Sequence, residues 1–137
     1  MDEIIYDYAK AFIGKPYLWG GNNPLSGFDC SGLVIELLKA WGKFPDQDSN
    51  AQGLFLYYRN KGNIPSQKCD FGKLCFYGKD LNSLTHVSFG IDYKYCLTAS
   101  GGGSKTLTEE DAIRQSAFVK IRPFNYRKDL KAILDTN

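Results

Sequence analysis

The stretch Gly27-Phe-Asp-Cys-Ser-Gly-Leu-Val34 places a cysteine where a glycine-rich loop gives way to an apolar helix. Asp29 is a good helix N-cap, and the helix that follows carries one apolar stripe from Leu33 to Trp41. Cys30 then lies in the first turn, where free backbone N–H groups and the positive end of the helix dipole stabilise a thiolate. Its small neighbours leave the sulfur accessible. This pattern favours a reactive Cys30 over the alternative, a buried cysteine at a helix start.

The rest of the chain is predicted to form helices first and strands afterwards. Apolar residues at helical spacing predict further helices over residues 3–13, 49–62 (with Ser49 as cap) and 126–134. Short aromatic or β-branched segments predict strands over residues 73–77, 86–92, 95–99, 105–107 and 117–121. Residues 16–28 are expected to form a loop and residues 108–114 a turn. This order indicates an α+β domain with an antiparallel sheet.

Length and composition are typical of one packed domain. The chain has 137 residues, of which 43% are hydrophobic, 15% aromatic and 23% charged, and this argues against disorder. We therefore expect a single domain over residues 1–137. The net charge of +2 argues against a strongly electrostatic nucleic-acid binder. No apolar run approaches the roughly 18 residues that a membrane-spanning helix needs.

Four cysteines and a single histidine limit the metal chemistry. The cysteines are Cys30, Cys69, Cys75 and Cys96, and no two of them form a CxxC pair. The usual zinc knuckle and the thioredoxin motif are therefore absent, and we expect no metal site and no cofactor. The first residues lack the basic and apolar regions of a signal peptide, so we expect synthesis in the cytoplasm. A reducing compartment favours free thiols, although the even number of cysteines also allows disulfides.

Basic side chains gather near the end of the chain. They are Lys120, Arg122, Arg127, Lys128 and Lys131. Contact with an anionic polymer is one interpretation of this cluster. The interpretation we favour is an ordinary solvated helix face.

His86 is the only histidine and precedes an apolar strand. A histidine in such a position is usually a satisfied surface or core residue. If Cys30 needs an imidazole base, however, only His86 can supply it. A cysteine on an early helix and a histidine on a later strand follow the order of papain-like enzymes.

Further motifs surround this pair. Gly14-Lys-Pro-Tyr-Leu-Trp-Gly-Gly21 precedes the cysteine motif, and His86-Val-Ser-Phe-Gly-Ile91 follows it. Together with Asp29-Cys-Ser-Gly32, these segments resemble the signature of the NlpC/P60 family of cell-wall cysteine peptidases. Gly72-Lys-Leu-Cys-Phe-Tyr77 resembles the family's Gly-Asp-Leu-x-Phe-Phe strand, with a lysine where an acidic residue is usual. The resemblance covers about residues 10–100.

The resemblance implies a papain-like α+β fold, with an antiparallel sheet packed against helices and the nucleophile at a helix N-terminus. It implies hydrolysis of peptidoglycan stem peptides, typically between D-γ-glutamyl and diaminopimelate or lysine, through a thioester. Carried over, Cys30 is the nucleophile and His86 the base, while Tyr17 and the Cys30 backbone N–H stabilise the oxyanion. Asp29 and Ser31 match positions that contact the amine-bearing end of the substrate. For Asp29, a purely structural role as N-cap stays equally open.

Thr98 departs from the family pattern. The family often has His, Asn or Gln twelve positions after the catalytic histidine to orient its ring, and Thr98 holds that position here. A threonine hydroxyl can accept an imidazole N–H, but it is short and carries no charge. A backbone carbonyl or Ser100 is the alternative orienting group. We assign Thr98 to the catalytic group and expect weaker activity than the full pattern gives.

Other functions remain open beside the stem-peptide endopeptidase. The same framework supports N-acetylmuramoyl-L-alanine amidases and acyltransferases, and Thr98 leaves room for a weakly active or inactive cell-wall-binding or structural phage component. Without a signal peptide, a phage lysis or tail enzyme or a secreted effector would reach the cell wall after delivery. The sequence leaves open whether there is an inhibitor or delivery partner.

Overall fold

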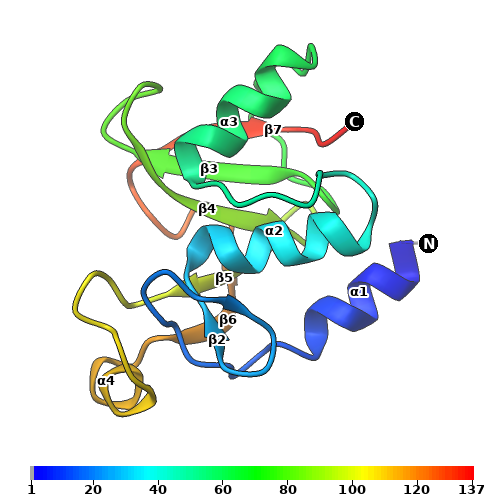
Figure 1. Cartoon of the computed structure of the whole chain (residues 1–137). Coiled ribbons are helices and arrows are strands. Elements are labelled where there is room, and N and C mark those ends of the chain that lie inside the picture. Colours follow the sequence, from blue (N-terminus) through cyan, green and yellow to red (C-terminus); the bar gives the residue numbers. More distant parts are fainter. Residues whose placement is uncertain (1) are drawn as a thin grey trace.

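The structure is a computed structural model that describes residues 2–137. The helices in this range are α1 (Asp2–Lys10), α2 (Cys30–Ala40), α3 (Ala51–Asn60) and α4 (Glu109–Gln115). The strands are β1 (Asn22–Asn23), β2 (Gly27–Phe28), β3 (Leu74–Gly78), β4 (Leu84–Gly90), β5 (Tyr95–Ser100), β6 (Phe118–Pro123) and β7 (Leu130–Leu134). Three helices precede the sheet, and the predicted α+β class is confirmed (Figure 1).

Within residues 2–137, five strands form one antiparallel sheet in the order β6-β5-β4-β3-β7. Side chains alternate between its faces: Leu74 and Phe76 join the main core, whereas Cys75 and Tyr77 join a smaller cluster on the other side. The main-core face packs against α2 and α3 (Figure 1). Tyr77 lies opposite His86 in the β3–β4 register, so the histidine is on the face away from these helices.

The apolar stripe of α2 fills the centre of the main core. Leu33, Leu37 and Leu38 are fully buried, as the helical spacing predicted. Burial of each leucine contributes about 1.5–3 kcal/mol relative to exposure. At the other end of the helix, the Trp41 ring packs against Phe71 at a centroid distance of 5.3 Å. Because α2 packs along β4 and β5, its first residue has a defined position relative to the sheet.

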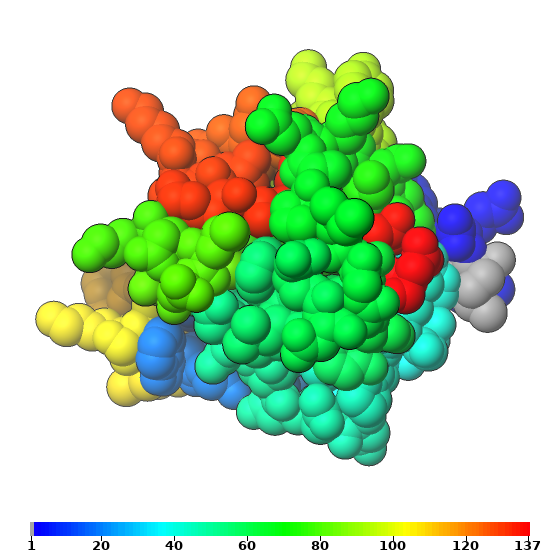
Figure 2. Space-filling model, turned by 90° about the horizontal axis from the view of Figure 1, so that it is seen from above, coloured from blue at the N-terminus to red at the C-terminus, as the bar shows by residue number. Residues whose placement is uncertain are grey.

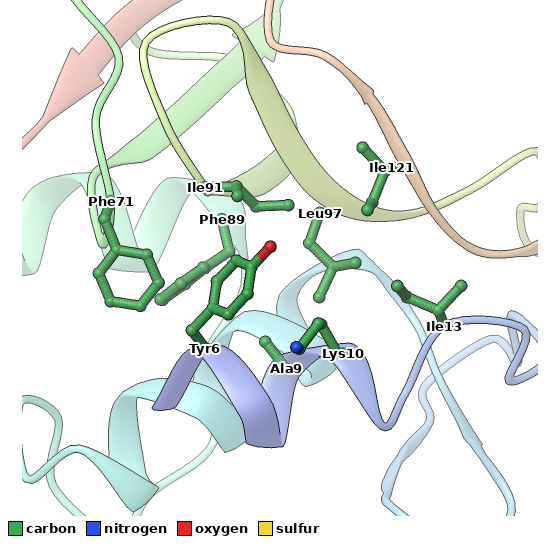
Figure 3. A pocket seen from close by; sticks show the side chains of 9 residues that line it. All are labelled: Tyr6, Ala9, Lys10, Ile13, Phe71, Phe89, Ile91, Leu97 and Ile121. Atoms are coloured by element: carbon green, nitrogen blue, oxygen red, sulfur yellow. The ribbon is translucent and has the colours of Figure 1, made fainter. Parts of the chain in front are cut away.

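Helix α1 packs against the same core (Figure 3). Its Tyr6 ring lies beside Phe89 and Leu97 around a cavity of about 10 Å³. The Lys10 ammonium lies 4.8 Å from the centre of the Tyr6 ring, a cation–π contact. The helix expected over residues 3–13 is therefore confirmed, although it already ends at Lys10.

Helix α3 forms part of the outer surface above the sheet. In the view of Figure 2 it lies in green beside the turn between β3 and β4, drawn in yellow-green. The Gln52 side chain joins these segments by donating a hydrogen bond to the Leu81 carbonyl at 2.9 Å. The sequence predicted Ser49 as the cap of this helix, but Asn50 takes that position and accepts the Gly53 backbone N–H at 2.8 Å.

The terminal helix expected over residues 126–134 is wrong, because Leu130–Leu134 form strand β7. This strand pairs with the outer edge of β3, where Cys75 lies opposite Ile133. Pairing satisfies backbone groups that an open edge would leave without partners, and this long-range gain outweighs the local helical pattern. The interpretation of the basic cluster as a helix face is wrong for the same reason, since Arg122 lies on β6 and Lys131 on β7.

Two smaller expectations after β5 are also wrong. Residues 105–107 form no strand, and the turn expected over residues 108–114 contains helix α4. Thr108 and Asp111 form a capping box at its start, and acidic residues in the first turn complement the helix dipole. These short-range hydrogen bonds make a helix where only a turn was expected.

Some classes of site are not found in the part of the chain that the structure describes. Over residues 2–137, no helix is long and apolar enough to cross a membrane. No cluster of three or more His, Cys, Asp or Glu side chains in this range is placed to hold a metal ion. All four cysteines in this range are free, and the Sγ atoms of Cys69 and Cys75 lie 3.6 Å apart.

We expect Gly32→Ala to destabilise the fold. A Cβ at this position would lie 2.0 Å from the Gly21 carbonyl oxygen, so backbone would have to move. Such overpacking costs about 1–3 kcal/mol and should lower the midpoint of thermal unfolding by several degrees. Gly103→Ala is the matched control, because its Cβ would have nothing within 4 Å. Equal unfolding midpoints for both variants and the wild type would contradict this packing constraint.

Candidate active site

Cys30 is the first residue of α2 and is half-buried. The Asp29 carboxylate caps this helix, with Oδ1 accepting the Gly32 backbone N–H at 2.7 Å. The same oxygen accepts the Ser31 hydroxyl at 3.3 Å. The Cys30 Sγ lies 3.9 Å from the Thr85 carbonyl oxygen on β4. The expected placement of Cys30 in the first turn of a capped helix is therefore confirmed.

His86 lies on β4 and is buried. Its Nε2 atom lies 2.8 Å from the Thr98 hydroxyl oxygen on β5. The Tyr126 hydroxyl oxygen lies 2.9 Å from the same nitrogen and comes from the segment between β6 and β7. Thr98 is therefore in contact with the imidazole, as its spacing from His86 suggested. A second hydroxyl, that of Tyr126, contacts the same nitrogen.

Tyr126 is the site residue that the sequence did not reveal. Its ring packs against Tyr77 at a centroid distance of 5.7 Å, and Tyr77 packs against His86 at 5.2 Å. Tyr126 and His86 are 40 positions apart, and they meet only because the chain turns back after β6. No local motif marks this contact, and the segment was expected to be helical.

Two hollows meet at Cys30 and together form one cleft. Residues that line both are Tyr17, Trp19, Cys30 and Thr85. The first hollow has a volume of about 310 Å³ and is completed mainly by His86, Ser100, Gly101, Gly102, Gly103 and Arg127. The second has a volume of about 300 Å³ and is completed mainly by Asp29, Ser31, Asn50 and Gln52. Of the expected site residues, only Thr98 lies outside the cleft lining, fully buried behind the imidazole.

Tyr17 is held rigidly at the shared part of the cleft. Its backbone N–H donates to the Ala117 carbonyl at 2.9 Å. Its ring packs directly on Gly102, where a Cβ would lie 2.3 Å from the ring. Burial raises the pKa of the Tyr17 phenol above its usual value, and the neighbouring Cys30 and Asp29 add to this effect. Tyr17 therefore presents a neutral hydroxyl group that can donate a hydrogen bond.

Burial keeps both the Cys30 thiol and the His86 imidazole neutral. It raises the pKa of the Cys30 thiol to about 11, although the backbone N–H groups of Val87 and Ser31 act in the opposite direction. It lowers the pKa of His86 to about 3, and the nearby Arg127 guanidinium lowers it further. The thiolate expected at the helix N-terminus is therefore not the resting form, because desolvation outweighs the helix dipole. Near neutral pH the pair consists of a thiol and an uncharged imidazole.

We expect the rate at which iodoacetamide alkylates Cys30 to have the pH dependence of a thiol with a raised pKa. Because the pKa values are about 11 for Cys30 and about 3 for His86, neither group titrates between about pH 5 and 9. The alkylation rate should then rise about tenfold per pH unit over this range, in step with the thiolate fraction. Mass spectrometry of the Cys30 peptide measures this rate, and the unfolded chain, with an ordinary thiol pKa of about 8.5, is the control. A plateau with a midpoint below about pH 7 would contradict the neutral pair.

The chain is similar to known proteins of one family. The model of the NlpC/P60 family matches residues 14–122. The chain is 56% identical over 92 residues to the bifunctional muramidase/DL-endopeptidase CwlT of Bacillus subtilis, a match covering 65% of this chain and 26% of CwlT. It is 33% identical over 114 residues to the peptidoglycan endopeptidase RipA of Mycolicibacterium smegmatis, covering 74% of this chain and 22% of RipA.

A solved structure shows the same fold over almost the whole chain. The crystal structure of an NlpC/P60 family protein from Bacillus cereus matches with a TM-score of 0.71 and 24% identity, covering 99% of this chain and 40% of that one. This chain spans about a quarter of the length of CwlT and RipA. The family model covers most of the sequence, including both Cys30 and His86, and the chain therefore belongs to the NlpC/P60 family.

Proposed function

We propose that this chain is a cysteine peptidase that hydrolyses amide bonds in peptidoglycan stem peptides. The observation that carries the proposal is that Cys30 and His86 line the same hollow. The hydroxyl groups of Thr98 and Tyr126 contact Nε2 of the imidazole. The names of two relatives, a DL-endopeptidase and a peptidoglycan endopeptidase, support this substrate class.

The proposed reaction is acyl transfer through a thioester. His86 takes the proton from the Cys30 thiol as its sulfur attacks the substrate carbonyl, and a tetrahedral oxyanion forms. The Cys30 backbone N–H and the Tyr17 hydroxyl stabilise this oxyanion. The imidazolium then protonates the leaving amine, and the carbon–nitrogen bond breaks. Water, deprotonated by the same imidazole, attacks the thioester and releases the acid and the free thiol.

The resting state fits general-base catalysis better than a preformed ion pair. A neutral imidazole can accept the thiol proton at the moment of attack, whereas an imidazolium cannot. The pKa of about 3 keeps His86 uncharged throughout the neutral range, although the same burial makes the imidazole a weaker base. Thr98 is part of the proposed catalytic group because its hydroxyl contacts Nε2 of His86, which leaves Nδ1 as the nitrogen that can take the proton.

The two hollows suggest how the substrate lies across Cys30. We assign the amine-bearing end of the substrate to the hollow that Asp29 and Ser31 line. The leaving amine then lies in the hollow on the His86 side, where the imidazole can protonate it. The bond that we favour is D-γ-glutamyl to diaminopimelate or lysine, as the family resemblance implies.

The capping and binding roles of Asp29 are compatible in one side chain. Its Oδ1 atom accepts the Gly32 N–H and caps α2, while the residue also lines the second hollow. Its carboxylate brings negative charge to a place where a substrate ammonium would lie. One residue can therefore fix the nucleophile and contact the substrate.

We expect cleavage of defined muropeptides to stop in Cys30→Ala and in His86→Ala. Product identification by mass spectrometry should show new γ-glutamyl carboxyl termini with the wild type and none with either variant. Cys69→Ala is the matched control, because this cysteine is not among the residues that line the cleft. Free lactyl groups would indicate an amidase instead, and retained acyl adducts an acyltransferase. Equal cleavage by Cys30→Ala and the wild type would refute the proposal.

We expect Asp29→Asn to separate capping from substrate binding. Asparagine is an equally good N-cap, so the unfolding midpoint should change little. Loss of the charge should lower kcat/KM about tenfold to a hundredfold for a muropeptide with a free amine, since a hydrogen bond between charged groups is worth about 1.5–3 kcal/mol. A muropeptide with that amine acetylated is the control and should be cleaved equally by both proteins. A tenfold loss with both substrates would contradict the assigned contact.

A further inference from the structure

The imidazole of His86 has two hydroxyl partners on one nitrogen. Thr98 Oγ1 lies 2.8 Å from Nε2 and comes from the neighbouring strand β5. Tyr126 Oη lies 2.9 Å from the same atom and comes from a different part of the chain. A neutral imidazole nitrogen has either one proton to donate or one lone pair to accept with. Two hydroxyl groups on a single ring nitrogen therefore need an explanation.

Contacts of its backbone, of its turn and of its ring hold Tyr126 in place. The Tyr126 backbone N–H donates to the Pro123 carbonyl at 2.9 Å. The Tyr77 hydroxyl donates to the Phe124 carbonyl at 2.6 Å and so ties the same turn to β3. The Arg122 guanidinium lies 5.2 Å from the centre of the Tyr126 ring. These contacts fix the turn that carries the phenol beside the histidine.

The proton count at His86 assigns the direction of these hydrogen bonds. Because both hydroxyls contact Nε2, Nδ1 is the nitrogen left to accept a proton from Cys30. Nδ1 must then be unprotonated, so the single proton of the imidazole lies on Nε2. The Nε2–H group then donates to the oxygens of Thr98 and Tyr126, and each hydroxyl keeps its own proton for another acceptor. Two neutral acceptors on Nε2 favour this tautomer more strongly than one does.

We propose that Tyr126 is a positioning residue for His86, and that its hydroxyl and that of Thr98 together replace the single His, Asn or Gln of the usual family pattern. This inference rests on the proposed function, because it assumes that His86 is the base. It explains how a threonine can stand at a position where the family often has a longer polar side chain. The second acceptor comes from the turn between β6 and β7, outside the aligned motif.

The groups around His86 agree with this role. Tyr77 faces it from β3 and Thr98 from β5, and Cys30 lines the same hollow from the start of α2. Arg127 and Asp129 are nearby and form an ion pair with an N–O distance of 2.7 Å, so much of their charge cancels. Burial raises the pKa of Tyr126, and the phenol therefore stays protonated. Among residues 2–137, the imidazole thus has hydroxyl partners and no directly bonded carboxylate.

The experiment uses the fact that His86 is the only histidine in the chain. In protein labelled with ¹⁵N-histidine, the ring nitrogen signals report the tautomer of His86 without any ambiguity of assignment. The wild type is expected to show the Nε2–H tautomer alone at neutral pH. Tyr126→Phe keeps the ring and removes only the oxygen, and it should show a mixture of both tautomers. Thr98→Val, which removes the other hydroxyl at similar volume, should have the same effect.

The kinetic consequence is measured on the same proteins with a defined muropeptide. Tyr126→Phe should lower kcat about fivefold to tenfold and leave KM unchanged, since one of two neutral hydrogen bonds to the ring is lost. The double variant Tyr126→Phe/Thr98→Val should lose more than either single variant. Tyr93→Phe is the matched control, because Tyr93 is 79% exposed and should change neither the tautomer nor kcat.

The outcomes separate this inference from the proposed function. If the wild type cleaves and Tyr126→Phe has the same kcat and the same tautomer, the positioning role is wrong while the proposed function stands. A lowered unfolding midpoint with unchanged kcat and tautomer also overturns it, because Tyr126 would then be purely structural. If Cys30→Ala cleaves as fast as the wild type, the proposed function fails, and the positioning role fails with it.

Discussion

At the start of α2, the Asp29 carboxylate accepts the Gly32 backbone N–H at 2.7 Å, and the Gly21 carbonyl lies too close to Gly32 for any side chain. This junction joins the loop that carries Tyr17 to the helix that carries Cys30. The remainder of α2 is buried against β4 and β5, so the Cys30 sulfur has a fixed position relative to β4, the strand that carries His86. Both hollows of the cleft depend on this junction, because Cys30 is the point at which they meet.

Burial then decides the chemistry that this position can support. A helix N-terminus favours a thiolate, but removal of the thiol and the imidazole from water favours the uncharged form of each. The pKa values of about 11 for Cys30 and about 3 for His86 show that desolvation is the larger effect here. In the proposed mechanism, charge therefore develops only during the reaction, where the backbone N–H of Cys30 and the Tyr17 hydroxyl can stabilise it. Hydroxyl partners on His86 suit such a pair, because they orient the ring without adding charge.

Local patterns in the sequence predicted the position of Cys30 at a helix start better than they predicted the sheet. The cap and apolar stripe of α2 lie within a few turns of one helix, so Asp29 and Cys30 could be placed from their neighbours. Strand β7 could not be placed in this way, because what makes it a strand is an unpaired edge of β3 more than fifty positions earlier. The role of Tyr126 could not be predicted for the same reason, since its contact with His86 spans 40 positions. Contact between Thr98 and His86 followed from family spacing, whereas its catalytic role stays a prediction.

In the proposed mechanism, Cys30 is the nucleophile among the four cysteines, and His86 is its base. A stem-peptide diazomethyl ketone, with the reactive carbon next to the D-γ-glutamyl carbonyl, tests this claim by peptide mapping after reaction. We expect a single adduct on Cys30, slower labelling in the presence of a competing muropeptide, and no adduct in His86→Ala. An adduct on Cys69, Cys75 or Cys96 with none on Cys30, in protein that still cleaves the muropeptide, would contradict it.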